Sequence, residues 1–317
     1  MGQNKLVFVT LVVAYLVSDV SCAKLSNCPT DDRLRPCSCS TVSPGGTQLS
    51  CYNITEPLGD LFKRLSNALQ NDTELYQLFL HSNVDTLEAN VFGQLKIDQI
   101  DLDMGKLANI HQDAFASTGV KGLSIAKSAI SDVNDQNNQA DYGLFKAIRA
   151  TKSLKTFYMS SSELTAIPDG AFQSVTHLES IIFSGTPLKR IGKNAFYDAA
   201  RLHVLTLTGV QLETIDAHAF NVGPRGGGGR KALDIRIEQG DLNQQILKPS
   251  SFEMVNDKVN LYLEYSDFDY LDETVFGKFL LNQTTHVIYT NNLICHDERN
   301  QWLYAKYRNN WKDNECN

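Results

Sequence analysis

Positive charge is not in excess in this chain, and that limits the partners it can attract by electrostatics alone. Its 317 residues include 29 lysines and arginines against 36 aspartates and glutamates, with a formal net charge of -7 and a pI near 5.5. Basic patches are what attract nucleic acids and anionic membrane surfaces. The charge balance therefore gives no reason to expect either of them as a partner.

Long apolar runs are also missing, apart from one near the N-terminus. Leu6 to Val17 supplies about 12 apolar residues after Lys5, whereas a membrane-spanning helix needs roughly 20. Ser21-Cys22-Ala23 then offers a small-residue cleavage site, so we interpret residues 1–23 as a secretory signal peptide rather than a retained signal anchor. The C-terminal end has no hydrophobic tail for a lipid anchor. We expect a secreted, extracellular protein without a membrane anchor.

Signatures of catalysis and of metal binding are absent from the sequence. It contains neither a Gly-x-Ser-x-Gly nucleophile elbow nor a His-Glu-x-x-His motif. The histidines lack the close spacing of a helical metal site, and we expect most of them to be solvated, with His203 on an inner surface. The sequence therefore predicts no enzyme, no metal and no cofactor. The seven histidines are His81, His111, His177, His203, His218, His286 and His296.

What the chain does contain is a unit of 24 residues written three times between Leu154 and Phe220. Each copy approximates L-x-x-L-x-L-x4-L-x2-I-x4-F, with alanine before the phenylalanine. A fixed period in the twenties with this apolar grid is the signature of a leucine-rich repeat, in which a short strand and a return segment make one coil. Because no coil can bury its own apolar face, the coils must stack into one core. We predict an α/β leucine-rich repeat solenoid, a curved horseshoe with a parallel concave sheet.

The same grid extends in degenerate form on both sides of these three copies, which share an exact spacing of 24 residues. Coils are predicted to start near Leu75, Ile97, Val120, Leu154, Leu178, Leu202, Ala232, Lys258 and Thr284. Each of the first eight should bury one phenylalanine on its convex side: Phe92, Phe115, Phe145, Phe172, Phe196, Phe220, Phe252 and Phe276.

Two coils carry extra residues, which repeat arrays place in loops. One insertion is the polar run Asn134 to Gln139, and the other is Pro224 to Lys231, which contains four consecutive glycines. The glycine run lacks the Lys-Ser/Thr of a phosphate-binding loop and precedes a strand. We interpret it as a surface loop, with the alternative that its three cations meet an acidic partner.

Position nine of a repeat commonly holds an asparagine whose amide bonds to the backbone of adjacent coils. Here only Asn83 and Asn292 occupy it, and the central coils have Ser162, Thr186 and Val210 instead. Since valine has no polar atom in its side chain, the backbone groups of that turn need other partners.

Cysteine is confined to the two ends of the chain. Removal of Cys22 with the signal peptide leaves six, and an even number at the ends of a secreted solenoid suggests disulfide-stapled caps that cover the end coils. A zinc site is the competing interpretation of the first four, although paired Cys-x2-Cys spacing is absent. Sequence alone allows three disulfide pairings among these four. The six are Cys28, Cys37, Cys39, Cys51, Cys295 and Cys316.

A short amphipathic helix is predicted after the first cysteine cluster. Leu58, Leu61, Phe62, Leu65 and Leu69 follow Pro57 at the spacing of one helical face. Its expected role is to cover the first coil, and the alternative is a simple linker helix. The predicted organisation is thus a signal peptide (1–23), a cysteine cap (24–53), a capping helix (54–74), the repeats (75–293) and a reduced C-terminal cap (294–317).

Both ends of the chain resemble known repeat caps. The opening C-P-x7-C-x-C-x11-C resembles the N-terminal cap of extracellular leucine-rich repeat proteins, which implies that Cys28 pairs with Cys39 and Cys37 with Cys51. The run from Asn292 to Cys295, with Trp302-Leu303 after it, resembles their C-terminal cap. Asp297 stands in place of that cap's second cysteine, so Cys295 to Cys316 is its only possible bridge.

The whole mature chain resembles the secreted leucine-rich repeat proteins of arthropods, a family similar to the non-catalytic subunit of shrimp (Oplophorus) luciferin 2-monooxygenase. The same cap and repeat motifs recur in Slit, Toll-like ectodomains and small matrix proteoglycans. Asn53, Asn71 and Asn282 begin Asn-x-Thr sequons and are candidate glycosylation sites in a secreted protein. Their positions leave the middle of the array free of sequons.

The surface left for function is the concave sheet. Because side chains alternate along a strand, position five of each coil should face outward there, and acidic residues flank it. We predict a partner-binding site at Tyr158, Ile182, Thr206, Arg236 and Tyr262, with Glu238 and Glu264 as its polar rim, against the alternative of ordinary solvated strand positions. Position five runs through Phe79, Asp101, Ser124, Tyr158, Ile182, Thr206, Arg236, Tyr262 and Ile288, and the flanking acids are Asp98, Asp103, Glu179, Asp234, Glu238 and Glu264.

The function predicted from these observations is a binding protein that holds a protein partner of unknown identity on its concave face. One alternative, which follows from the resemblance, is a stabilising, non-catalytic subunit of a secreted enzyme complex such as a luciferase-like monooxygenase. A second alternative is a structural component of the extracellular matrix. The oligomeric state is not predicted.

Overall fold

The computed structural model describes residues 28, 32–42, 46–69, 74–131, 141–223, 231–239, 242–253, 258–263, 265–281, 286–291, 293–313 and 316. Several predicted features lie outside these residues. They are the signal peptide, the insertion at 134–139, residues 224–230 of the glycine-rich insertion, and the individual residues Asn71, Glu264, Asn282 and Asn292.

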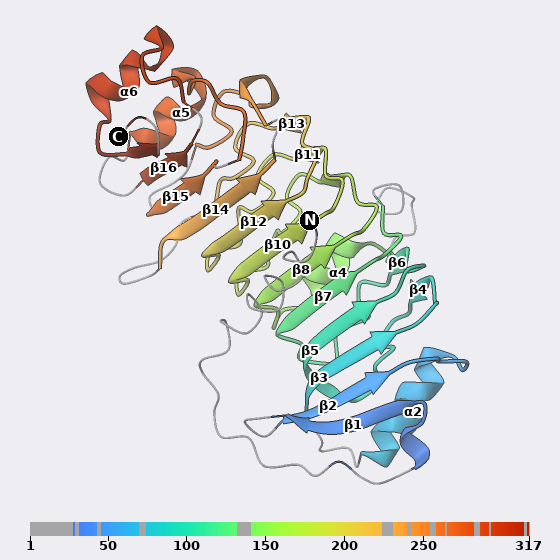
Figure 1. Ribbon diagram of the computed structural model, residues 1–317. Coiled ribbons are helices and arrows are strands. Elements are labelled where there is room, and N and C mark those ends of the chain that lie inside the picture. The colour runs from blue at the N-terminus through green and yellow to red at the C-terminus, as the bar shows by residue number, and fades with distance from the viewer. Residues whose placement is uncertain are drawn as a thin grey trace, which may run out of the picture.

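One curved sheet of 12 strands runs the length of the described chain, and Figure 1 shows its strands side by side in chain order. β1 and β2 pair antiparallel, and every later neighbour in the sheet is parallel. Parallel neighbours require a return segment in each coil, which confirms the predicted leucine-rich repeat solenoid. The strands are β1 (Cys37–Val42), β2 (Gly46–Cys51), β3 (Glu74–His81), β5 (Lys96–Asp103), β7 (Gly122–Ala126), β8 (Thr156–Ser160), β10 (Ser180–Ser184), β12 (Val204–Thr208), β14 (Leu233–Glu238), β15 (Val259–Tyr262), β16 (His286–Thr290) and β17 (Trp311–Asp313).

The return segments contain short strands and helices on the opposite side of the core. Two-residue strands form a second ladder in the order β13-β11-β9, and β4 pairs with β6. These are β4 (Thr86–Leu87), β6 (Asn109–Ile110), β9 (Ala166–Ile167), β11 (Arg190–Ile191) and β13 (Thr214–Ile215). The helices are α2 (Leu58–Ala68), α4 (Leu144–Ala150), α5 (Glu273–Leu280) and α6 (Gln301–Lys306), with single 3-10 turns η1 (Asp32–Leu34), η2 (Gln244–Ile246) and η3 (Glu298–Asn300).

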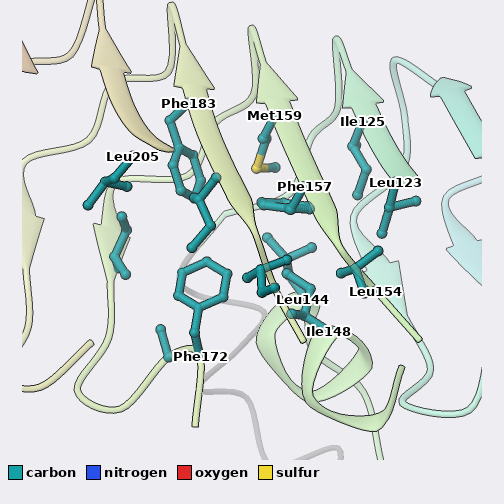
Figure 2. Close-up of a cluster of buried hydrophobic side chains, with 14 of the residues drawn as sticks. Leu123, Ile125, Leu144, Ile148, Leu154, Phe157, Met159, Phe172, Phe183 and Leu205 are labelled. Atoms are coloured by element: carbon teal, nitrogen blue, oxygen red, sulfur yellow. The ribbon is translucent and has the colours of Figure 1, made fainter. Parts of the chain in front are cut away.

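The predicted phenylalanines form a spine along the convex side of the core. All eight are buried, and consecutive rings from Phe145 to Phe276 lie 5.0–6.1 Å apart between centroids. Aromatic pairs at such distances contribute about 0.5–1.5 kcal/mol beyond their area burial. In the coil that carries the first insertion the return segment is α4, and Figure 2 shows its Leu144 and Ile148 beside Leu154 and Phe157 of the neighbouring strand segment.

The N-terminal cap closes the first coil as the sequence predicts. Disulfides join Cys28 to Cys39 and Cys37 to Cys51. The capping helix α2 buries Leu58, Leu61, Phe62 and Leu65, and the Phe62 ring lies 4.9 Å from Phe92 at the start of the phenylalanine spine. The helix is therefore part of the core and not a linker.

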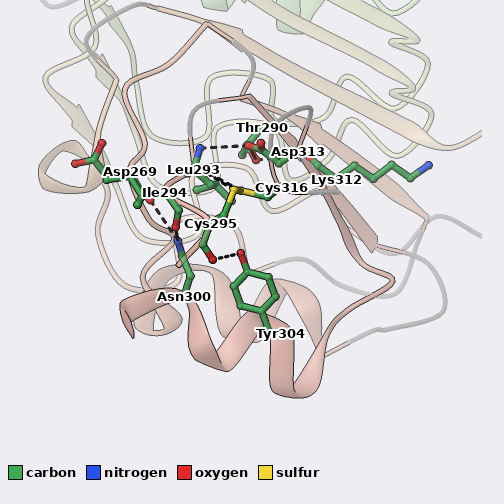
Figure 3. The surroundings of a disulfide bond; sticks show 10 residues. All are labelled: Asp269, Thr290, Leu293, Ile294, Cys295, Asn300, Tyr304, Lys312, Asp313 and Cys316. Atoms are coloured by element: carbon green, nitrogen blue, oxygen red, sulfur yellow. Dashed lines mark hydrogen bonds between the residues drawn. A yellow bond between two sulfur atoms is a disulfide. The ribbon is translucent and has the colours of Figure 1, made fainter. Parts of the chain in front are cut away.

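The C-terminal cap is closed by the predicted Cys295–Cys316 disulfide, shown in Figure 3. The Tyr304 hydroxyl of α6 donates to the Cys295 carbonyl, and the buried Asn300 amide donates to the carbonyls of Asp269 and Ile294. Asp297, which replaces the usual cysteine, accepts a hydrogen bond from the Arg299 backbone N–H at 2.8 Å and so caps η3. In the usual form of this C-terminal cap, the position of Asp297 holds a cysteine that forms a second disulfide. Here the residue at that position caps the 3-10 turn η3 instead.

The position-nine residues do not form the hydrogen bonds that asparagine commonly makes at this position of a repeat. Asn83 is exposed, and the preceding Ser82 is buried in its place. The hydroxyls of Ser162 and Thr186 are buried without a hydrogen-bond partner among the described residues. At Val210 the missing bonds are supplied from the next coil. The buried Gln239 side chain accepts from the Leu212 N–H at 2.7 Å and donates to the Leu212 carbonyl at 3.0 Å.

The register of β16 differs by one residue from the predicted one. Ile288 pairs with the core residue Leu261 and is fully buried, so its predicted place on the concave surface is wrong, and Tyr289 pairs with Tyr262 instead. His286 consequently occupies a core position. It is buried, its ring stacks on Phe279 at 4.6 Å, and its Nδ1 contacts the Phe279 carbonyl oxygen at 2.5 Å.

The other histidines differ in their exposure to solvent. His81, His177 and His296 are exposed, which leaves fewer solvated histidines than expected. His203 is half-buried, and its Nε2 is buried without a hydrogen-bond partner within the described chain.

Candidate partner-binding face

Five of the predicted site residues form one straight row across five adjacent strands. In the strand pairing, Tyr158 lies opposite Ile182, which lies opposite Thr206, then Arg236, then Tyr262. The two neighbours of each of the first four along its own strand are core residues, whereas the row itself is only half-buried. The structure therefore brings these five residues together on the outward face of the sheet.

Sequence reasoning missed the last two members of the row. Tyr289 on β16 pairs with Tyr262, and Lys312 on β17 pairs with Tyr289. The rings of Tyr262 and Tyr289 stack with centroids 4.5 Å apart and an interplanar angle of 10°. A correct register for β16 would have identified Tyr289 from the sequence, but β17 falls outside the repeat pattern and offered no such signal.

The middle of this face carries no charge. The half-buried side chains on β8, β10 and β12 are Thr156, Tyr158, Ser160, Ile182, Ser184, Val204, Thr206 and Thr208. The Thr208 hydroxyl donates to the Ser184 hydroxyl at 3.3 Å, so part of this polar surface is already internally bonded. Depletion of charge around aromatic and aliphatic side chains is the composition found at the centre of protein interfaces.

The acidic residues that flank the face are mostly paired with a neighbouring coil. Lysine ammonium groups lie near three of them: Lys121 at 2.8 Å from Asp98, Lys127 at 2.9 Å from Asp103, and Lys155 at 3.6 Å from Glu179. The Asn260 amide donates to Asp234 at 2.7 Å. Glu238, at the end of β14, is exposed and is the described carboxylate that best fits the predicted rim.

Asp101 occupies the row two strands before Tyr158 and has an unusual environment. Burial raises the pKa of its carboxyl, although hydrogen bonds from Gln77, whose amide lies at 2.7 Å, and from Ser124 oppose the rise. The row therefore changes in character along the array, from a desolvated carboxylate near the N-terminal end to aromatic rings and cations near the other.

Neither a metal centre nor a membrane span stands out in the described part of the chain. Its histidine, cysteine, aspartate and glutamate side chains form no group of three or more that could hold a metal ion. In the same residues, no helix has the length and apolar character needed to cross a membrane. Of the three sequons, Asn53 is exposed beside the N-terminal cap, and the other two lie outside the described residues.

A parallel sheet built from repeated coils of about 24 residues and closed by disulfide-bonded caps defines a leucine-rich repeat solenoid. Residues 50–136 and 132–223, more than half of the chain, match the BspA type leucine rich repeat region in six copies, and the chain belongs to this family.

The chain was also compared with curated proteins and with solved structures. A search of curated proteins finds no significant match. Among solved structures, the chain is similar to human 5T4 (Wnt-activated inhibitory factor 1, trophoblast glycoprotein), with 12% identity and a TM-score of 0.44 over 93% of this chain and 90% of that one. The resemblance to the arthropod luciferase-subunit family is not confirmed by these comparisons.

Proposed function

We propose that this protein is a secreted, non-catalytic binding protein that holds a protein partner on its concave face. The observation that carries the proposal is the row Tyr158, Ile182, Thr206, Arg236 and Tyr262 on five adjacent strands. Strands about 4.8 Å apart make this row roughly 20 Å long. That length is enough to engage one segment or one small face of another protein.

The composition of the row supports an interface rather than a plain solvated surface. Tyrosine and arginine are the residue types that most often dominate binding energy, particularly where they surround an uncharged centre. Here Tyr158, Ile182 and Thr206 lie on the uncharged strands β8, β10 and β12, and Arg236 and Tyr262 follow on β14 and β15. The row therefore offers a tyrosine anchor at each end and, beside the second one, the charge of Arg236 to orient the partner.

Three disulfides support the secreted context. Disulfides persist in oxidising compartments and are rare in the cytosol. The predicted signal peptide and sequons point the same way. The partner is accordingly sought among extracellular proteins.

The test is capture of the partner from native secretions by the immobilised wild-type protein, followed by titration with variants. Tyr158→Ala and Tyr262→Ala should each weaken binding by more than about 1 kcal/mol, because they remove anchors from the row. Tyr197→Ala is the matched control, since Tyr197 is exposed in a return segment away from the sheet.

Stability provides the second control. Both row variants should unfold close to wild type, whereas Phe196→Ala in the phenylalanine spine should cost about 3–5 kcal/mol of stability. Partner binding that survives both tyrosine changes but is lost when residues 224–231 or 134–139 are altered would show that the insertions carry recognition. A captured stoichiometric enzyme would identify the chain as the non-catalytic subunit of a complex.

A further inference from the structure

The C-terminal end of the concave face holds an alternation of cation, ring, ring and cation on four adjacent strands, β14 to β17. We call Arg236, Tyr262, Tyr289 and Lys312 the cation–tyrosine row. The Arg236 guanidinium carbon lies 3.7 Å from the centroid of Tyr262, Tyr262 stacks on Tyr289 at 4.5 Å, and Lys312 Nζ lies 5.5 Å from the centroid of Tyr289. In Figure 1, β14, β15 and β16 of this row are neighbours.

The stacking fixes the two cations but does not neutralise them. A cation over a tyrosine face is attracted to the ring quadrupole by about 0.5–1 kcal/mol at exposed sites, which positions the side chain and leaves its full charge. Arg236 and Lys312 contact the rings, and neither forms an ion pair within the part of the chain that the structure describes. Both therefore retain the capacity to bind an anion.

Of the nearby carboxylates that the structure describes, Asp313 and Asp234 accept hydrogen bonds from other groups, and Glu238 lies exposed on the strand of Arg236. Asp313, next to Lys312 in sequence, is buried and accepts hydrogen bonds from the Thr290 hydroxyl at 2.9 Å and the Leu293 N–H at 3.2 Å. Figure 3 shows the Lys312 side chain extending away from this group. Asp234 accepts from Asn260, and the exposed Glu238 lies two residues beyond Arg236 on the same strand.

We infer that the cation–tyrosine row binds an acidic peptide segment whose two carboxylates are spaced to meet Arg236 and Lys312. Three strand spacings separate the two cations along the sheet, or roughly 14 Å, and an extended peptide advances about 3.4 Å per residue. The carboxylates should therefore be about four residues apart, which also puts them on the same side of an extended chain. This inference rests on the proposed concave binding function and specifies the chemistry of the partner.

Charge pattern favours a peptide over a uniformly anionic polymer such as a sulfated glycan. Glu238 is exposed beside Arg236, and Asp234 precedes Arg236 on the same strand by two residues. Like charges brought together at an interface disfavour the wrong partner, and a polymer with an anion on every unit cannot avoid these two carboxylates. A peptide can place its carboxylates only where the cations stand.

The probe is a set of fluorescein-labelled glycine–serine peptides with two glutamates placed two, four or six residues apart, measured by fluorescence anisotropy on the intact mature protein. The four-residue spacing should bind tightest, and at least about tenfold tighter than its diglutamine counterpart, a difference of about 1.4 kcal/mol. Added salt should weaken the binding, since it screens exposed charge.

Substitutions test whether Arg236 and Lys312 are the groups that bind the peptide. Arg236→Gln and Lys312→Gln should each lower the affinity of the four-residue peptide by about tenfold or more, and Arg236→Lys should restore part of it. Lys127→Gln is the matched control because Lys127 is already paired with Asp103 on the same face. If Arg236→Gln does not fold, Lys312→Gln decides alone, since Lys312 is exposed at the last strand.

The outcomes separate this inference from the proposed function. A wild-type protein that does not distinguish glutamate from glutamine peptides, or that prefers a heparin-derived hexasaccharide, overturns the inference. Equal peptide affinity in wild type and both cation variants also overturns it. If Tyr158→Ala still abolishes capture of the native partner in any of these cases, the concave function stands and only its acidic chemistry is wrong.

Discussion

At the scale of single residues, Asp101 couples the concave face to pH. Burial raises the pKa of its carboxyl above the ordinary value of 3.8, so the folded protein favours the protonated form. The contribution of this group to stability is therefore fully present below that ordinary value. It is lost as the pH rises through the raised folded pKa. At neutral pH, the ionised carboxylate costs the fold some of its stability.

Replacement of this residue gives a prediction with a definite sign. Asp101→Asn should raise the Tm at pH 7, because it removes a desolvated charge and keeps an oxygen that accepts from Gln77. The gain should shrink as the pH falls through the raised pKa of the folded protein, and it should be gone below the ordinary value of 3.8, where the wild-type carboxyl is protonated in both states. Thermal unfolding followed at several pH values measures it. Asp103→Asn serves as the control, since Asp103 is paired at the surface with Lys127, and such pairs are worth little.

At the scale of elements, the turn after β12 shows how one coil compensates for another. Val210 offers no polar atom, and the Gln239 side chain from the next coil satisfies both backbone groups of Leu212. A buried side-chain amide that makes two such hydrogen bonds joins the two coils. Its removal would leave an N–H and a carbonyl unpaired in a dry environment.

Gln239→Leu should therefore lower the free energy of unfolding by about 1–3 kcal/mol, the usual cost of unsatisfied buried polar groups. Chemical denaturation at equilibrium measures the change, and Gln211→Leu on the same turn is a control because Gln211 is exposed. A Gln239 variant as stable as wild type would mean that water or another group satisfies Leu212. In that case the two hydrogen bonds between Gln239 and Leu212 would not contribute to stability.

How far the sequence predicted these elements depended on how clean each repeat was. The coils from Leu154 to Phe220 have an unambiguous apolar grid, and their core and outward residues are as predicted. In β16 the run His286 to Thr290 has apolar residues at both alternations, so periodicity could not choose the face. The structure places His286 inward, which no pattern of apolar residues would suggest.

Of the candidate site, too, only a part could be predicted from the sequence. Its five central residues could be predicted because strand pairing in an array with fixed period follows from the sequence alone. Lys312 could not, because β17 joins the sheet after a cap whose path is set by a disulfide, by Asn300 and by α6 rather than by a repeat. The cation–tyrosine row thus depends on tertiary contacts that have no local sequence signal.

At the scale of the whole molecule, each coil is stabilised by its neighbours, and disulfides close the caps at the two ends. In the chain-entropy estimate, a bridge with the 21-residue separation of Cys295 and Cys316 contributes roughly 3 kcal/mol. The double change Cys295→Ser and Cys316→Ser should lower stability by about that amount. Hydrogen exchange should show loss of protection first in β15, β16 and β17, because each coil relies on its neighbour.

The matched experiment is the loss of the Cys28–Cys39 bridge at the other end, which should expose β1 and β2 and leave β16 protected. Simultaneous loss of protection along the whole sheet in either variant would show that the solenoid unfolds as one unit. Alkylation of the intact protein should find no free thiol among the six paired cysteines.

The C-terminal disulfide also decides how the molecule responds to mechanical force. Tension applied at Cys316 passes through the sulfur–sulfur bond directly to Cys295 and bypasses η3, α6 and β17 between them. These elements bear no load while the disulfide is intact. The bypassed segment of 21 residues, about 70 Å when extended at roughly 3.4 Å per residue, is therefore never released. A protein pulled by its partner and its own terminus would therefore keep Lys312 beside Tyr289 until the neighbouring coils come apart.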